Sequence, residues 1–148
     1  MKIQFFSDIH LEDGKVDFVL GDCDVLVICG DLGVGMTAIT WLDETLVDVK
    51  VPIIYVPGNH EFYYHNLYEM LAVFESRCHE MGIDFLYNKS VMIGDVLFCG
   101  TTLWTDFNLH NRQHNKMIIA TDQMTDYLVV DGNDGKLTPQ EVLVEHQK

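Results

Sequence analysis

Side chains of metal-binding type stand at three places in this 148-residue sequence, each directly after an apolar run. They are Asp8, His10, Asp31, Asn59 and His60. Hard divalent cations prefer carboxylate, amide and imidazole ligands of this kind. A carboxylate shared by two cations, for which Asp31 is the natural choice, would hold them about 3.5–4 Å apart for an in-line displacement at phosphorus. The residue types therefore indicate a divalent-metal site that acts on a phosphoester.

Three predicted strands, at residues 2–7, 24–29 and 51–56, must bring these side chains together. The second is a nearly continuous apolar run, which is typical of a strand buried on both faces of a sheet. Residues 36–49 and 66–80 carry apolar side chains at spacings of three and four, which predicts amphipathic helices. In an open α/β sheet the carboxyl ends of the strands line one crevice, so we expect the site residues to converge there.

The second half of the chain predicts a small hairpin and a final helix. Apolar runs at 91–93 and 96–99 flank a Gly-Asp turn, which favours a β-hairpin. Residues 127–130 are apolar and predict one more strand. Thr138, with Glu141 three positions later, is typical of a helix that begins with a capping box. The alternation of strands and helices predicts the α/β class.

Three short motifs contain the site residues: Asp8-Ile9-His10, Gly30-Asp31 and Gly58-Asn59-His60-Glu61. In order and spacing they resemble the first three signature blocks of the calcineurin-like metallophosphoesterases. Residues 100–107 also look like a segment of small prokaryotic and phage members, so the resemblance covers nearly the whole chain. It implies that residues 1–148 form a single domain with the layered αββα sandwich of that family.

The resemblance also implies a role for each site residue. Asp8, His10 and Asp31 would hold one metal, and Asp31 and Asn59 would hold the second. His60 would be the catalytic residue, facing the scissile phosphate to stabilise the transition state or protonate the leaving oxygen while a metal-bound hydroxide attacks phosphorus. The cofactors would be two divalent metal ions, with Mn²⁺ favoured on ligand hardness and Zn²⁺, Fe²⁺, Ni²⁺ or Mg²⁺ as alternatives.

The chain departs from the family pattern after residue 107. The family normally supplies three further histidine ligands, from a downstream strand end and a G-H-x-H block, and this sequence contains neither. We therefore expect a domain that is incomplete at the C-terminus, with part of the second sheet missing. Replacement ligands could come from His110 and His114, which are four residues apart, or from His146, although solvated surface histidines are the simpler interpretation.

A second departure from the family pattern limits the class of substrate that we expect. The phosphoprotein-phosphatase branch continues its second block with another acid and an arginine, and residues 30–36 have neither. The predicted function is therefore hydrolysis of a small phosphomonoester or phosphodiester. The alternative is a non-catalytic metal-binding or interaction module, and a third possibility is that a separate polypeptide supplies the missing segment.

Charge and hydropathy restrict the partners. Nine Lys and Arg against 23 Asp and Glu give a formal charge of −14, so extended duplex nucleic acid is an unfavourable partner. No apolar run approaches the ~20 residues needed to cross a bilayer, and the N-terminus has no signal-peptide core, which predicts a cytoplasmic protein without a membrane partner. The incomplete sheet predicts a homo-oligomer or a partner that covers it.

Aromatic residues near the motifs have two interpretations. Tyr63 and Tyr64 follow the third motif directly, so they either face a substrate or pack in the core. Trp104 and Asp106 lie in the family-like segment at 100–107 and either contact the site or serve the fold.

Overall fold

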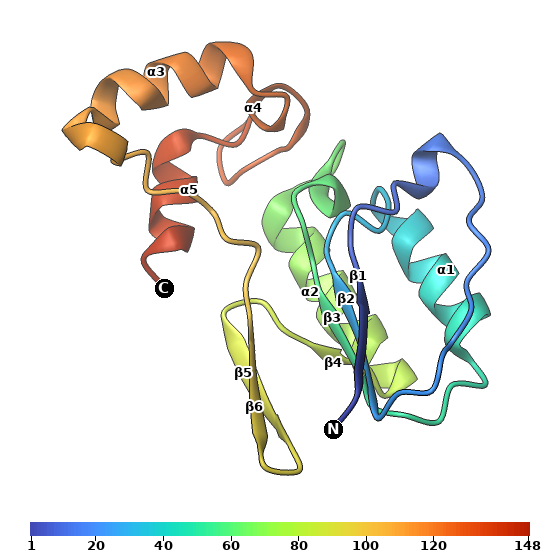
Figure 1. The fold of residues 1–148 in the computed structure, drawn as a ribbon. Coiled ribbons are helices and arrows are strands. Elements are labelled where there is room, and N and C mark those ends of the chain that lie inside the picture. Colours follow the sequence, from blue (N-terminus) through green and yellow to red (C-terminus); the bar gives the residue numbers. More distant parts are fainter.

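Four short parallel strands form the sheet that carries the predicted site. The computed structural model, which describes residues 1–148, has β1 (Ile3–Phe6), β2 (Val25–Cys29), β3 (Ile53–Val56) and β4 (Asp84–Phe85) in that order across the sheet (Figure 1). The three strands predicted from apolar runs are confirmed. With only two residues, β4 is too short to produce an apolar pattern.

Two helices cover one face of this sheet, as their apolar spacing predicts. They are α1 (Met36–Leu46) and α2 (Leu67–Met81), and their inner side chains join one core with alternate residues of β2 and β3. Asn66 caps the start of α2 by accepting hydrogen bonds from the backbone N–H groups of Tyr68 and Glu69. Gly82 ends α2 in the left-handed conformation, with a φ of 70°.

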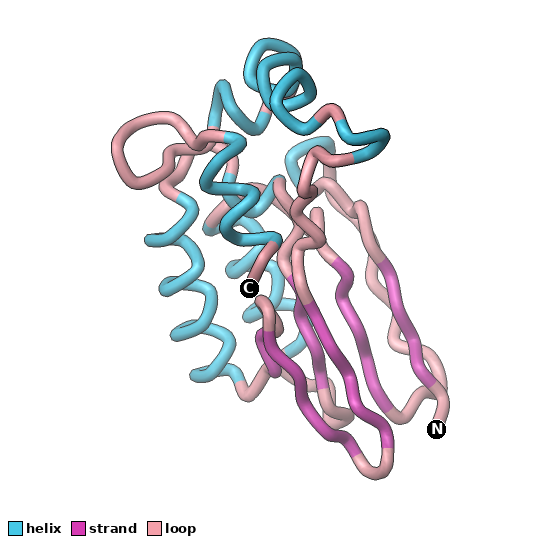
Figure 2. Tube along the Cα trace, turned by 90° about the vertical axis from the view of Figure 1, so that its left-hand side faces the viewer, coloured by secondary structure: helices cyan, strands magenta, loops and turns pink.

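A β-hairpin covers part of the opposite face. Strands β5 (Lys89–Ile93) and β6 (Val96–Gly100) pair antiparallel, which confirms the predicted hairpin. Their inner side chains pack on a small apolar cluster of Val25, Ile54 and Leu86. Figure 1 shows the hairpin and α1 on opposite sides of the main sheet, and Figure 2 looks from the hairpin side, with the hairpin in front of the main sheet. The predicted layered fold is confirmed, with a second sheet of only two strands.

The last third of the chain is helical and lies toward the carboxyl ends of the parallel strands (Figure 1). It contains the 3₁₀ turn η3 (Leu109–Asn111), followed by α3 (Gln113–Gln123), α4 (Asp126–Val129) and α5 (Pro139–His146). Two more 3₁₀ turns, η1 (Leu11–Asp13) and η2 (His60–Phe62), follow β1 and β3. No helix has the length and apolar character needed to cross a membrane.

The prediction of a strand at 127–130 is wrong, because the chain forms the helical turn α4 there. The N–H of Val130 donates to the carbonyl of Asp126 at 2.9 Å, so local bonds satisfy this backbone. Only beyond the turn does the chain extend, where Asp131 makes an isolated bridge with Asn66. A short apolar run is compatible with either a strand or a helix. Because residues 127–130 lie beside no strand of either sheet, they form a helical turn.

The capping box of α5 gives a test of local stability. The Thr138 hydroxyl accepts from Glu141 N at 3.2 Å, and Thr138 N donates to the Glu141 carboxylate at 2.9 Å. We expect Thr138→Ala to lower the free energy of unfolding by about 1 kcal/mol, measured by urea denaturation. Thr125→Ala is the matched control, since Thr125 precedes α4 without a side-chain cap bond. Equal losses in the two variants would contradict the prediction.

Candidate functional site

The carboxyl ends of β1 and β2 bring three predicted ligands together. One ligand atom from each of Asp8, His10 and Asp31 lies within 4.8 Å of the other two. Backbone hydrogen bonds hold the loops in register, from Asp8 N to Gly30 O at 3.1 Å and from His10 N to Asp31 O at 3.0 Å. The convergence expected from the strand order is therefore present in the structure.

The backbone at these three residues is strained. Asp8, His10 and Asp31 have φ values of 55°, 50° and 51°. These values lie in the left-handed region, which residues other than glycine seldom adopt. Such conformations cost about 1–3 kcal/mol each and persist only where surrounding contacts enforce them, which is common at functional sites. All three residues that bring their ligand atoms together thus have this backbone conformation.

Two glycines allow the β2 and β3 loops to approach each other. A Cβ atom on Gly58 would lie 2.1 Å from the Asp31 carboxylate, and one on Gly30 would lie 2.8 Å from the Gly58 nitrogen. Gly30 also has a φ of 83°. The glycines of the second and third motifs are thus required by close backbone packing directly behind Asp31.

The third motif places Asn59 and His60 beside this group. His60 N donates to Asp31 Oδ1 at 3.0 Å, which joins the β3 loop to the central carboxylate. Asn59 Nδ2 donates to the Tyr63 hydroxyl at 3.0 Å, which fixes the orientation of the amide group. Burial raises the pKa of Tyr63 to about 12, which keeps this hydroxyl protonated.

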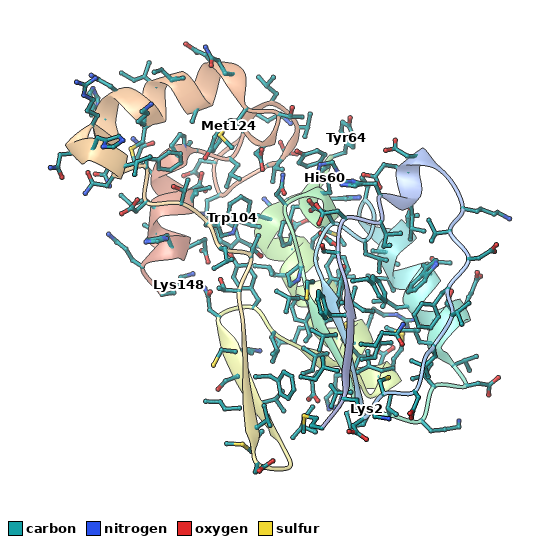
Figure 3. All side chains as sticks on the ribbon, in the orientation of Figure 1. Lys2, His60, Tyr64, Trp104, Met124 and Lys148 are labelled. Atoms are coloured by element: carbon teal, nitrogen blue, oxygen red, sulfur yellow. The ribbon has the colours of Figure 1, made fainter.

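The His60 imidazole lies between aromatic neighbours and a carboxylate. It stacks on Tyr63 with ring centroids 4.2 Å apart and meets His10 edge-on at 4.5 Å. Figure 3 shows His60 near Tyr64, at the end of the sheet opposite Lys2. The stacking partner of the predicted catalytic residue is therefore Tyr63, whereas the Tyr64 side chain is 71% exposed.

Sequence reasoning missed Glu12, which contacts both imidazoles. Its Oε1 atom lies 2.8 Å from His60 Nδ1 and 3.2 Å from His10 Nδ1. The hydrogen bond to Glu12 raises the pKa of His10, while partial burial opposes that shift. Burial raises the pKa of Glu12, but hydrogen bonds from His60 and His10 outweigh it and the net pKa is lowered. The only signal in the sequence is an acid two positions after His10.

Glu61 belongs to the third motif, but sequence reasoning gave it no role of its own, and in the structure it is fully buried. Its carboxylate accepts four hydrogen bonds, from Asp31 N at 3.1 Å, Leu32 N at 2.8 Å, Gly58 N at 2.8 Å and the Tyr55 hydroxyl at 2.8 Å. Burial raises the pKa of Glu61, and the hydrogen bonds oppose the rise. One side chain of the third motif thus satisfies the backbone on both sides of Asp31.

The donor set fits a hard divalent cation. Two carboxylates and an imidazole lie within reach of one ion, and the Asn59 amide stands on the neighbouring loop. The side chains of His10 and His60 are 27% exposed, so solvent reaches the group. Oxygen and imidazole ligands with room for water suit Mn²⁺ and similar ions.

The histidines considered as replacement ligands lie elsewhere. His110 is in η3 with a non-helical φ of 65°, and His114 is in α3, so the two do not share a helix face. His146 Nδ1 instead binds the Trp104 carbonyl at 2.6 Å. The structure has two groups of potential metal ligands, one of Asp8, His10 and Asp31 and one of His10, Glu12 and His60. Neither group includes any of the three histidines considered as replacements.

Trp104 and Asp106 have structural partners. Trp104 Nε1 donates to the Tyr87 hydroxyl at 3.1 Å. The Asp106 carboxylate accepts from Asn108 N at 2.8 Å, which forms a local turn. These contacts favour the structural interpretation of residues 100–107.

Comparisons with known proteins give one family. The model of calcineurin-like phosphoesterases matches residues 1–146. An uncharacterised protein of Acanthamoeba polyphaga mimivirus is 27% identical over 157 residues, covering 92% of this chain and 54% of the viral protein. A phosphopantetheinyl hydrolase from Mycobacterium tuberculosis has a similar fold, with a TM-score of 0.72 and 17% identity, over 99% of this chain and 60% of that one. The chain thus spans between half and two thirds of the length of these two proteins.

The role of Glu61 can be measured by unfolding. Glu61→Gln replaces one acceptor oxygen with an amide that cannot accept, which leaves two buried donors unpaired. Each unpaired donor costs about 1–3 kcal/mol, so we expect the free energy of unfolding to fall by ~2–6 kcal/mol in urea.

Glu44→Gln is the matched control for this measurement. Glu44 is exposed on α1, so its replacement is expected to change stability by no more than about 0.5 kcal/mol. Unfolding of both variants at the same urea concentration would show that the Glu61 bonds do not stabilise the site.

Proposed function

Because this chain belongs to the calcineurin-like phosphoesterase family, we propose that it is a divalent-metal-dependent phosphoesterase. The reaction would be hydrolysis of a phosphomonoester or phosphodiester. The observation that carries the proposal is the group of Asp8, His10 and Asp31, whose ligand atoms lie within 4.8 Å, with His60 bonded to Asp31 through its backbone. The left-handed backbone of all three residues supports the proposal, because such conformations are common at functional sites.

The proposed metal ligands divide into two sets that share Asp31. Asp8, His10 and Asp31 would hold one cation, and Asp31 and Asn59 would hold the other. When bound, the cations would lower the pKa of a water and offset the charge of the phosphate. Mn²⁺ is the proposed ion, since carboxylate and amide oxygens predominate among the ligands.

His60 is the proposed catalytic residue. Its ring is fixed by Tyr63 on one face and by Glu12 at Nδ1, so the opposite nitrogen, Nε2, is the one available to a substrate. From there the imidazole would stabilise the phosphoryl transition state or give a proton to the leaving oxygen. In this role His60 does not bind metal.

The second candidate function is binding without catalysis. It is favoured by the composition of the second ligand set, where Asp31 and Asn59 are the only proposed protein ligands. A cation with two ligands keeps most of its waters and is held weakly. Mn²⁺ stoichiometry separates the candidates, because two ions per chain support the phosphoesterase and one or none supports the binding module.

Association with a second copy or another chain is also proposed. β1 is an edge strand of the main sheet, and Ile3 and Phe5 on it are 45% and 73% exposed. Uncovered apolar side chains at a sheet edge favour pairing with another chain. The strongly acidic composition argues that this partner is not duplex nucleic acid.

Hydrolysis of chromogenic esters tests the proposed activity. We expect Mn²⁺-dependent release of 4-nitrophenol from 4-nitrophenyl phosphate or its bis-ester. Asp31→Asn should abolish it, and His60→Ala should lower kcat by about 10²–10⁴-fold. Asp48→Asn, at an exposed position after α1, is the control that should retain full activity. A wild-type chain inactive on both esters at every Mn²⁺ concentration would favour the binding module.

Thermal unfolding tests the metal site without requiring turnover. Because a cation held by Asp8 and Asp31 binds only the folded chain, saturating Mn²⁺ should raise the Tm. At 100 times Kd the gain is about 2.7 kcal/mol, which corresponds to roughly 5–10 °C for a chain of this size. Asp31→Asn should lose most of this shift. An unchanged Tm of the wild type in Mn²⁺ and in chelator would refute the site.

A further inference from the structure

One carboxylate oxygen contacts both imidazoles of the candidate site. Glu12 Oε1 lies 2.8 Å from Nδ1 of His60 and 3.2 Å from Nδ1 of His10. The two rings are nearly perpendicular, at 75°. Glu12 and His60 are separated by 48 positions in sequence, so the tertiary fold makes this contact.

The backbone fixes the position of Glu12. It lies in η1, where Asp13 N donates to His10 O at 2.8 Å and closes the turn. Leu11 N donates to Leu32 O at 3.0 Å, which attaches the same turn to the loop after β2. The residues before and after Glu12 are therefore both held by backbone hydrogen bonds, and this turn places the Glu12 carboxylate beside the imidazoles.

The contact determines which ring nitrogen carries the proton. An ionised carboxylate only accepts hydrogen bonds, so Nδ1 of each ring must donate to Glu12. A neutral imidazole has one proton, and its other nitrogen, Nε2, then presents a lone pair on the opposite side of the ring. Metal-binding histidines are commonly oriented by a carboxylate in this way.

We propose that Glu12 is a positioning residue that holds His10 and His60 in the Nδ1–H state through one shared oxygen. For His10 this leaves Nε2 as the metal-binding atom. For His60 it makes Nε2 the atom that faces the substrate. The part concerning His60 rests on the proposed function: when the ring is doubly protonated, Glu12 keeps the Nδ1 proton in place. The second proton, on Nε2, then passes to the leaving oxygen as the P–O bond breaks, which returns the ring to its neutral Nδ1–H form.

Tautomer measurement tests the proposal in the metal-free chain. Long-range ¹H–¹⁵N correlation spectra at about pH 9, above the ordinary histidine range, distinguish Nδ1–H from Nε2–H rings. His10→Ala and His60→Ala assign the signals. We expect Nδ1–H at both rings in the wild type and a shift of both toward Nε2–H in Glu12→Ala.

Asp13→Ala is the matched control, since Asp13 is an exposed acid in the same turn with no side-chain hydrogen bond. It should leave both tautomers as in the wild type. Nε2–H rings in the wild type, or equal shifts in both variants, would overturn the proposal. A shift at only one histidine would overturn it for the other.

Two further readouts separate positioning from general stability. Calorimetric titration with Mn²⁺ should show about 10–100-fold weaker binding in Glu12→Ala, through loss of the His10 orientation. The kcat of Glu12→Ala should fall at least about tenfold more for phenyl phosphate than for 4-nitrophenyl phosphate, because the poorer leaving group needs the proton. Equal losses for the two esters would overturn the part concerning His60.

The two proposals fail in distinguishable ways. A wild-type chain without hydrolytic activity would refute the phosphoesterase, and with it the part concerning proton transfer from His60. The tautomers and the Mn²⁺ affinity need no turnover, so they would still decide whether Glu12 orients the two imidazoles.

Discussion

The buried carboxylate of Glu61 is the constraint on which the site depends. It accepts hydrogen bonds from the N–H groups of Asp31 and Leu32 in the loop after β2 and of Gly58 in the loop after β3. The Tyr55 hydroxyl is a fourth donor. Buried backbone donors are costly when unpaired, so this side chain joins the ends of β2 and β3. The left-handed backbone of Asp31 is held because its own N–H is one of the donors.

This connection explains how the site is assembled before any cation binds. Gly30 and Gly58 allow the loops after β2 and β3 to pack closely, and His60 N links the two loops by donating to Asp31 Oδ1. The hydrogen bond from Asp8 N to Gly30 O holds Asp8 close to Asp31, in the group that also contains His10. Two carboxylates so near each other repel, so a bound cation would relieve the repulsion and link metal binding to folding.

A second buried carboxylate, away from the candidate metal ligands, attaches the helical last third to the loop between β4 and β5. Glu145 on α5 is 2% exposed and accepts from the Tyr87 hydroxyl at 2.9 Å. The Tyr87 hydroxyl in turn accepts from Trp104 Nε1. Trp104 donates within this network, and its carbonyl contacts His146 Nδ1 at 2.6 Å. Both residues therefore support the fold, and neither joins the ligand group.

The sequence alone determined whatever depends on neighbours along the chain. The three main strands, the two long helices, the capping box at Thr138 and the motif residues were all readable, since periodicity and capping are local. The tertiary structure decided the rest. Glu12 meets His60 across 48 positions, and Glu61 is buried only because two loops close over it. Residues 127–130 likewise became helical because no strand lies beside them to pair with. Each outcome depends on contacts between distant segments, which local patterns do not encode.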